Sequence, residues 1–288
     1  MKKVLMRLLS AGGMGLFLVG MLLTGNTKVQ AATLGQEVYI KSSSTTLYYD
    51  MDGNGTKDMV RILCGKKGYS YENIRIYING KIALNKNLSN CSHVYVQYLS
   101  CTSKKNYLQI SAFQTGNELY MCKIYNYSGG KLVEAADLKY GWNITTRVTK
   151  VTSEAITIKC FVQVRETGLI TWNFVYKPNG NKLKLKSNTA SAKSMLGSMS
   201  CNDGYQKYFQ KNRFVTARKR TYYTSYYLKN KAFTTKVGDV LTLSKVKIVN
   251  KKVYLNFTAK GKSGWIKATG NYDPAGEWFR GVSRRLAG

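Results

Sequence analysis

The chain has 288 residues, with 45 Lys and Arg against 14 Asp and Glu, and a formal net charge of +31. Its hydrophobic content of 44% is enough for a packed core, which excludes a wholly disordered basic chain, and its length allows one large domain or two ordinary ones. A single histidine and few carboxylates leave little material for acid–base catalysis or for a metal site built from nitrogen ligands.

The first 31 residues have the features of an export signal. Basic residues precede an apolar run over residues 8–23, and Val29 and Ala31 occupy the −3 and −1 positions of a small-residue cleavage site. The run is shorter than the ~20 residues that span a bilayer. We therefore expect cleavage after Ala31 and a secreted protein with no membrane span, an uncleaved N-terminal anchor being the alternative. Cleavage removes four basic residues and lowers the charge from +31 to +27.

The rest of the chain has the apolar period of two that predicts β-strands. Residues 74–78 alternate in this way before an Asn-Gly hairpin turn, and residues 156–164 and 170–176 do so on either side of the turn at residues 166–168. The only candidate for a helix is a short one at residues 204–210. We predict an all-β protein.

Residues 187–212 lack this alternation and are rich in Ser, Asn, Ala and Gly, which favours a domain boundary there. The prediction is an N-terminal β-domain over residues 32–200, a linker over residues 201–212 and a C-terminal module over residues 213–288. The last 88 residues carry +15 and residues 32–200 carry +12, so the C-terminal part is the more basic per residue.

The N-terminal domain contains a weak internal repeat, with units at residues 48–62, 95–112 and 147–160. The spacing of about 50 residues is typical of propeller blades. Three units are too few to close a propeller, which takes about four to eight blades. We therefore expect an antiparallel propeller-like stack or a compact β-sandwich.

Residues 50–58, Asp-Met-Asp-Gly-Asn-Gly-Thr-Lys-Asp, form the sharpest chemical motif. Three carboxylates in nine residues repel one another unless a cation lies between them, and a hard cation with six to eight oxygen ligands suits the spacing. The glycines permit tight turns, while the alternative is a plain hairpin turn without an ion. We predict one structural Ca²⁺, with side-chain or main-chain oxygens from Asp50, Asp52, Asn54, Thr56 and Asp58.

Arg61 stands where an EF-hand would have its last glutamate, and the residues flanking the loop read as strands. The pattern Asp-x-Asp-Gly-Asn-Gly-x-x-Asp followed by Met-Val resembles the calcium-binding loop of FG-GAP/VCBS repeats, the blade units of integrin-α-type propellers. The resemblance covers about 17 residues. It implies that Asp50, Asp52, Asn54 and Asp58 ligate Ca²⁺ between two strands, and that only one such site is filled.

Residues 213–268 read as five short strands, with Gly238-Asp239 at the start of one strand and Gly264-Trp265-Ile266 at the end. With these motifs the segment resembles a bacterial SH3-type domain. The resemblance implies a small SH3-like barrel of the kind found in secreted, wall-associated proteins that bind peptidoglycan or other wall polymers. The tail that follows could pack back on the barrel or bind an anionic partner.

Basic and aromatic residues interleave early in this module, an arrangement that can stack sugars or bases and hold anions. The alternative is that two of the tyrosines face the core and the others are ordinary surface. The candidate ligand-binding residues are Arg218, Lys219, Arg220, Tyr222, Tyr223, Tyr226 and Tyr227.

The remaining chemistry-bearing residues indicate no active site. His93 stands alone, and no nucleophile or zinc motif is present. In an exported chain six cysteines allow either disulfides or buried free thiols, and the sequence leaves this open. The cysteines are Cys64, Cys91, Cys101, Cys122, Cys160 and Cys201.

Together these features predict a secreted, non-enzymatic protein of the cell envelope. It would be stabilised by Ca²⁺ and would attach to wall polymers or other polyanions through the basic module, with nucleic acid bound only non-specifically. One alternative is an extracellular adhesin whose N-terminal domain binds a protein or a glycan. A second is an exported hydrolase with a cryptic site.

Overall fold

The computed structural model describes residues 32–40, 44–102, 104–116, 118–141, 144–199, 204–269 and 277–282. The expected export signal, Cys201 and most of the C-terminal tail lie outside these ranges. The described chain is mostly antiparallel β-structure, with one short helix, α1 (Gln206–Gln210), and one 3₁₀ turn, η1 (Leu196–Ser198). The all-β prediction is confirmed.

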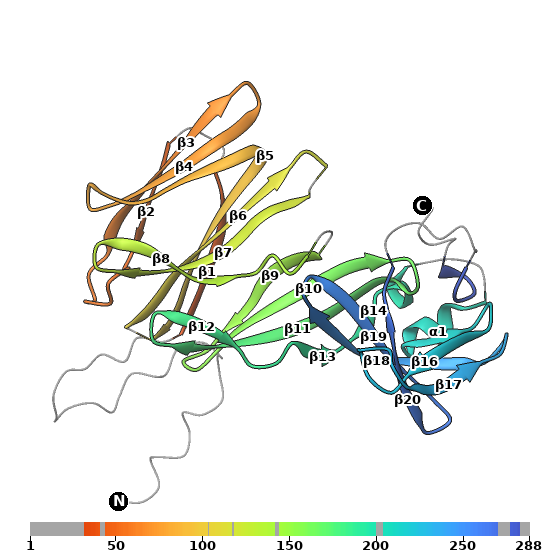
Figure 1. Cartoon of the computed structure of the whole chain (residues 1–288). Helices are drawn as coiled ribbons and strands as arrows, with labels where there is room; N and C mark the ends of the chain where they lie inside the picture. Colours follow the sequence, from red (N-terminus) through yellow and green to blue (C-terminus); the bar gives the residue numbers. More distant parts are fainter. Residues whose placement is uncertain are drawn as a thin grey trace, which may run out of the picture.

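Sheet A contains the first eight strands and is bent around its longest one (Figure 1). That strand, β5, pairs with β4 in its first half and with β6 and β1 in its second half, so it belongs to both parts of the sheet. The order is β2-β3-β4-β5-β6-β7-β8, with β1 added on β5. The strands are β1 (Thr33–Tyr39), β2 (Ser44–Tyr49), β3 (Asp58–Lys67), β4 (Ser70–Ile78), β5 (Lys81–Thr102), β6 (Lys105–Gln114), β7 (Leu119–Ser128) and β8 (Lys131–Asp137).

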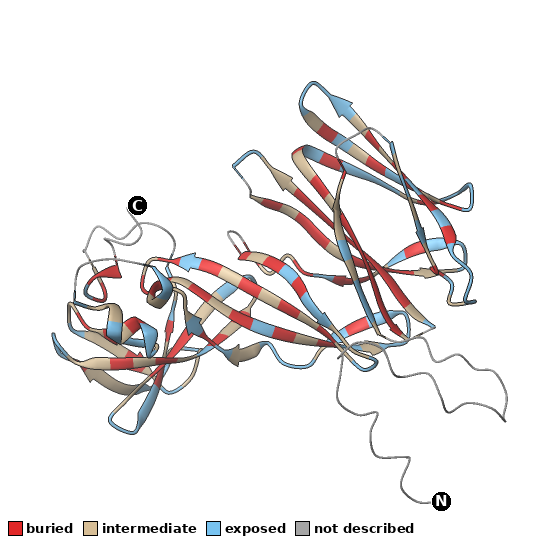
Figure 2. Ribbon diagram, turned by 180° about the vertical axis from the view of Figure 1, so that it is seen from behind, coloured by how far each residue is buried: buried red, intermediate tan, exposed pale blue. Residues whose placement is uncertain are grey.

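Sheet B is a meander with the order β12-β11-β10-β9, and the short β14 pairs with β11. Its central strands include the two runs whose alternation predicted them, and they exchange hydrogen bonds in register from Ile156 opposite Tyr176 to Val164 opposite Gly168. The strands are β9 (Ile144–Val151), β10 (Ile156–Val164), β11 (Gly168–Asn179), β12 (Lys182–Leu185) and β14 (Lys193–Ser194). Buried and more exposed residues alternate along these strands (Figure 2).

The bent sheet A and sheet B together make stacked layers. Leu108 and Ile110 on β6 face a core enclosed within sheet A. Tyr107, on the opposite face of the same strand, belongs to a second core shared with Ile158 and Trp172 of sheet B. Strand β6 is therefore buried on both faces. Its sequence does not reveal this, because the face toward sheet B carries polar residues that alternate with apolar ones as on a half-exposed strand.

Sheet C forms the C-terminal module, with the order β13-β18-β19-β20-β16-β17 and β15 added on β18. Its phenylalanines Phe214, Phe257 and Phe279 pack against one another at 5.1–6.0 Å between ring centroids. The described strands of all three sheets form open sheets, so the propeller-like and SH3-like assignments stay predictions. The strands are β13 (Thr189–Ser191), β15 (Arg213–Val215), β16 (Arg220–Tyr223), β17 (Lys231–Thr235), β18 (Val240–Val249), β19 (Lys252–Ala259) and β20 (Lys262–Lys267).

The segment expected to separate two domains is built into both of its neighbours. Strand β13 pairs with β18 of sheet C, and β14 pairs with β11 of sheet B. Within the described part of the expected linker, Phe209 is 1% exposed, and the side-chain nitrogen of Asn212 donates hydrogen bonds to the carbonyls of Ala192 and Leu243. One hydrophobic core includes residues of sheets B and C and of this segment. The segment is therefore packed against both sheets, unlike a free linker.

Candidate metal loop and candidate binding surfaces

The acidic loop connects β2 and β3, so the strands expected on its two sides are present. The pairing of Tyr49 with Asp58 closes it, and the Tyr98 hydroxyl donates a hydrogen bond of 2.9 Å to the Asp50 carbonyl. Gly53 and Gly55 have φ angles of 76° and 88°, in the left-handed region that glycine enters without strain. This local chemistry turns the chain within a few residues and returns it to the sheet.

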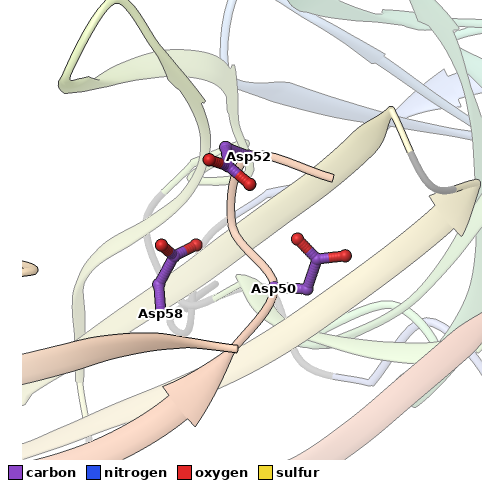
Figure 3. Close-up of side chains that lie close together, drawn as sticks. All are labelled: Asp50, Asp52 and Asp58. Carbon is purple, nitrogen blue, oxygen red and sulfur yellow. The ribbon is translucent and has the colours of Figure 1, made fainter. Parts of the chain in front are cut away.

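The loop brings three carboxyl groups together, those of Asp50, Asp52 and Asp58 (Figure 3). One oxygen from each lies within 4.8 Å of the other two. Asp50 and Asp58 are only 8% and 5% exposed, whereas Asp52 is exposed. Burying two carboxylates beside a third is unfavourable unless donors or a cation balance the charge.

Backbone and amide donors provide part of that balance. Asp50 accepts hydrogen bonds from the N–H groups of Gly53 (2.8 Å) and Gly55 (3.0 Å). Asp58 accepts one from the Met51 N–H (2.8 Å) and one from the Asn79 side chain (2.6 Å). These donors are neutral, so the cluster keeps its negative charge and could hold a hard cation through the remaining oxygen lone pairs.

The other two expected ligands form contacts within the loop. The Asn54 amide nitrogen donates to Asp52 at 3.0 Å, and its oxygen accepts the Thr56 N–H at 2.7 Å. The sequence analysis missed Asn79, which lies in the turn between β4 and β5. Its side chain donates a hydrogen bond to Asp58 and accepts one from the Met59 N–H. In the sequence Asn79 is marked only as part of an Asn-Gly turn, and this motif does not reveal that the turn lies beside the acidic loop.

The seven candidate ligand-binding residues of the C-terminal module are divided among different environments. Tyr222 is fully buried and stacked on Phe233, with 4.8 Å between ring centroids. It is therefore a core residue and not, as the sequence had suggested, part of a binding surface. The Tyr226 and Tyr227 rings meet at a tilt of 32° with 4.1 Å between their centroids, and the Lys247 ammonium lies 4.7 Å from the centroid of the Tyr226 ring.

Lys219, Arg220 and Tyr223 line a cleft of about 520 Å³ together with Lys267 and Trp278. The Arg220 guanidinium lies 4.0 Å from the Trp278 ring centroid, and that of Arg218 lies 5.5 Å from it. The described part of the tail packs back on the module, because Phe279 is fully buried and bridges to Thr216. The sequence did not show that this packing brings Trp278 beside the basic residues.

His93, the only histidine of the sequence, lies in an aromatic cluster. Its ring is 5.6 Å from that of Tyr39 and 6.4 Å from that of Tyr95, and the Ser92 hydroxyl is 2.8 Å from its Nδ1. Among the described residues no carboxylate hydrogen-bonds to His93, which a serine–histidine–acid triad would need.

No family model, no curated protein and no solved structure matches the chain. Among the described residues, no helix has the length and apolar character needed to cross a membrane.

Proposed function

We propose that the protein is a secreted, non-enzymatic binding protein of the cell envelope. It attaches to wall polymers or other polyanions through its C-terminal module, and a bound Ca²⁺ stabilises its N-terminal β-domain. The proposal includes the finer fold assignment, in which the acidic loop belongs to a VCBS-like unit and sheet C to an SH3-like module.

The observation that carries the binding role is the cleft containing Lys219, Arg220 and Lys267. None of its described lining residues is acidic, and the net charge of the chain is +31. The Trp278 ring holds the Arg220 guanidinium by a cation–π contact. The half-buried Tyr223 offers an aromatic surface in the same cleft. Anionic groups of a polymer would meet the cations while a sugar ring packs on the tyrosine.

For the loop, Ca²⁺ is the cation that suits the ligands best. Ca²⁺ accepts six to eight oxygens in flexible geometry, whereas Mg²⁺ requires near-ideal octahedral geometry and retains several waters. The cluster offers carboxylates from one short loop whose backbone is shaped by two glycines. Bound there, Ca²⁺ would neutralise Asp50, Asp52 and Asp58 and hold the β2–β3 connection in place, which is a structural role.

The test of the binding role is a pair of double variants in the full chain. The cleft variant is Lys219→Gln/Lys267→Gln. The control variant is Lys81→Gln/Lys131→Gln, which removes the same charge from exposed hairpin positions of sheet A. Binding to purified wall material is measured over a salt titration.

We expect the cleft variant to bind about tenfold more weakly, as the loss of two exposed charge contacts predicts, and the control variant to bind as the parent does. Equal binding by all three proteins contradicts the proposal. Binding that persists unchanged at ~1 M salt contradicts the charge mechanism, because screening then acts within about 3 Å.

A further inference from the structure

A second basic surface lies across sheet B, away from the residues discussed so far. It consists of three adjoining clefts of about 380, 650 and 760 Å³. The first two share Glu37, Arg147 and Phe161, and the last two share Thr149 and Lys159. They form one depression, the sheet B groove, whose lining residues come from β1, β5, β9, β10 and β11 and from the segment around β13 and β14. Figure 1 labels these strands.

Strand register places the basic residues of the groove side by side. Arg147 on β9 is directly opposite Lys159 on β10, and Lys159 is directly opposite Asn173 on β11. Opposed residues of neighbouring strands share a face of the sheet, with Cβ atoms about 4.5–5.5 Å apart. The adjacent row across the same face consists of Thr145, Phe161, Thr171 and Lys193.

The pairing of Arg147 with Lys159 works against folding, because like charges directly opposite each other destabilise a sheet. In the described part of the chain neither side chain forms an ion pair, and Glu37 is the one carboxylate lining the groove. Lys186 and Lys193 extend the positive charge toward the far end. An anionic ligand would balance these charges.

Among the described lining residues, partly exposed aromatic side chains occupy only one end of the groove, because Trp172 and Phe174 in the 760 Å³ cleft are 2% and 1% exposed. His93, Tyr95, Phe113 and Phe161 line its 380 Å³ cleft, and the Tyr95 and Phe113 rings meet edge to face at 5.8 Å. The rest of the described lining is mostly lysine, hydroxyl and amide side chains, such as Thr171, Asn173 and Thr189. Single-stranded nucleic acid is held by aromatic platforms repeated along the strand, whereas hydroxyl and amide groups suit the hydroxyls of a sugar chain.

We propose that the sheet B groove binds an extended acidic polysaccharide. Arg147, Lys159 and the lysines beyond them hold its carboxylates, and a sugar ring packs at the aromatic end. The inference rests on the proposed function only in that the ligand is an anionic polymer, and it uses none of the residues of the C-terminal cleft.

The test measures binding of a galacturonate oligosaccharide to the full chain by calorimetry. The groove variant, Arg147→Gln/Lys159→Gln, is compared with the parent, with the control variant Lys81→Gln/Lys131→Gln and with the cleft variant. We expect the groove variant alone to lose about tenfold in affinity, from one charge contact at the exposed Arg147 and one at the half-buried Lys159. Equal affinity in the groove variant and the parent would overturn the inference, whatever the cleft variant does.

Two further measurements address specificity and folding. An oligothymidylate with the same number of charges should bind the parent more weakly than the oligosaccharide, and equal or tighter binding would overturn the assignment to a glycan. Without ligand, the groove variant should melt at the same temperature as the parent or higher, because a like-charge contact is removed. A clearly lower melting temperature would mean that Arg147 and Lys159 serve the fold instead.

If the cleft variant loses wall binding while the groove variant binds galacturonate as the parent does, the result supports the proposed function and rejects the sheet B groove as a binding site. The reverse result rejects the C-terminal cleft and keeps the groove.

Discussion

The backbone N–H of Thr269 donates a hydrogen bond of 2.7 Å to Oε1 of Glu166, a residue 103 positions earlier in the chain. The Thr269 hydroxyl donates to the same oxygen. Glu166 lies in the turn between β10 and β11, and Thr269 follows β20, so the contact joins sheet B to sheet C. Glu166 is 0% exposed, and its Oε2 has no hydrogen-bond partner among the described residues.

This buried carboxyl group should make stability depend on pH. Burial raises the pKa of Glu166 in the folded protein, although the Thr269 donors and Arg165 act in the opposite direction. A raised folded pKa means that the contribution of Glu166 to stability is fully present below the unfolded pKa of about 4.3, and is lost as the pH rises through the folded value.

We therefore expect Glu166→Gln, which retains a side-chain oxygen for Thr269, to reduce the loss of stability between acidic and neutral pH. Urea unfolding at a series of pH values measures this, with the exposed Glu72→Gln as the matched control. A pH dependence that is the same in Glu166→Gln as in the parent would show that another group is responsible.

The acidic loop should make unfolding depend on Ca²⁺. At free Ca²⁺ tenfold above the dissociation constant, binding adds about 1.4 kcal/mol to the free energy of unfolding. Asp52→Asn is the informative variant, because Asp52 is exposed and, within the described structure, accepts hydrogen bonds only from Asn54. It should abolish the Ca²⁺-dependent rise in melting temperature and change stability in EDTA very little.

Glu154→Gln, at an exposed position outside the loop, is the charge-matched control and should keep the full response to Ca²⁺. Thermal unfolding in EDTA, CaCl₂ and MgCl₂ distinguishes the cations. A larger shift with Mg²⁺ than with Ca²⁺ would assign the site to Mg²⁺, and no shift with either cation would leave the loop as a plain turn.

Tyr222 provides a test of core against surface. Its ring is fully buried against Phe233 and Phe257, and its hydroxyl has no hydrogen-bond partner within the described structure. We expect Tyr222→Phe to leave the free energy of unfolding unchanged or to raise it by about 1 kcal/mol, since an unpaired buried hydroxyl is removed. Tyr222→Ala should cost about 3–5 kcal/mol, as truncation of a large buried aromatic ring does. Destabilisation by Tyr222→Phe in denaturant unfolding would mean that the hydroxyl has a partner.

The cysteines should be unreactive in the folded protein. The five described cysteines are free and buried, and burial raises the pKa of the Cys64, Cys91 and Cys101 thiols to about 11. Because the thiolate is the reactive form, a water-soluble thiol reagent should label none of the five before unfolding and all five afterwards. The count is made in a Cys201→Ser background. Fewer than five labelled thiols after unfolding without reductant would reveal a disulfide.

Local features of this protein could be predicted from its sequence. The meander of β10 and β11 follows from apolar alternation around a Gly turn, because side-chain direction in a strand depends only on position. The acidic cluster could also be predicted, because its residues are close together in the sequence. Asp50, Asp52 and Asp58 lie within nine residues, and most of their hydrogen bonds come from the same loop.

Features that depend on the packing of distant strands could not be predicted in this way. Gln109 and Ser111 alternate with apolar residues as a solvent-facing row would, yet they are 2% exposed because sheet B covers that face of β6. Tyr222 is buried against Phe233 and Phe257 of neighbouring strands. Trp278 lies beside Arg220 because the described part of the tail packs back on sheet C.

The hairpin of β9 and β10 sets Arg147 opposite Lys159, but the sheet B groove also needs residues of β1, β5 and the segment around β13 and β14, which come from distant parts of the chain. Residue type and spacing are enough to specify a strand or an ion-sized loop, because the interactions that form them are short in sequence. The faces that become buried, and the charges that become neighbours, depend on contacts between segments far apart in the chain.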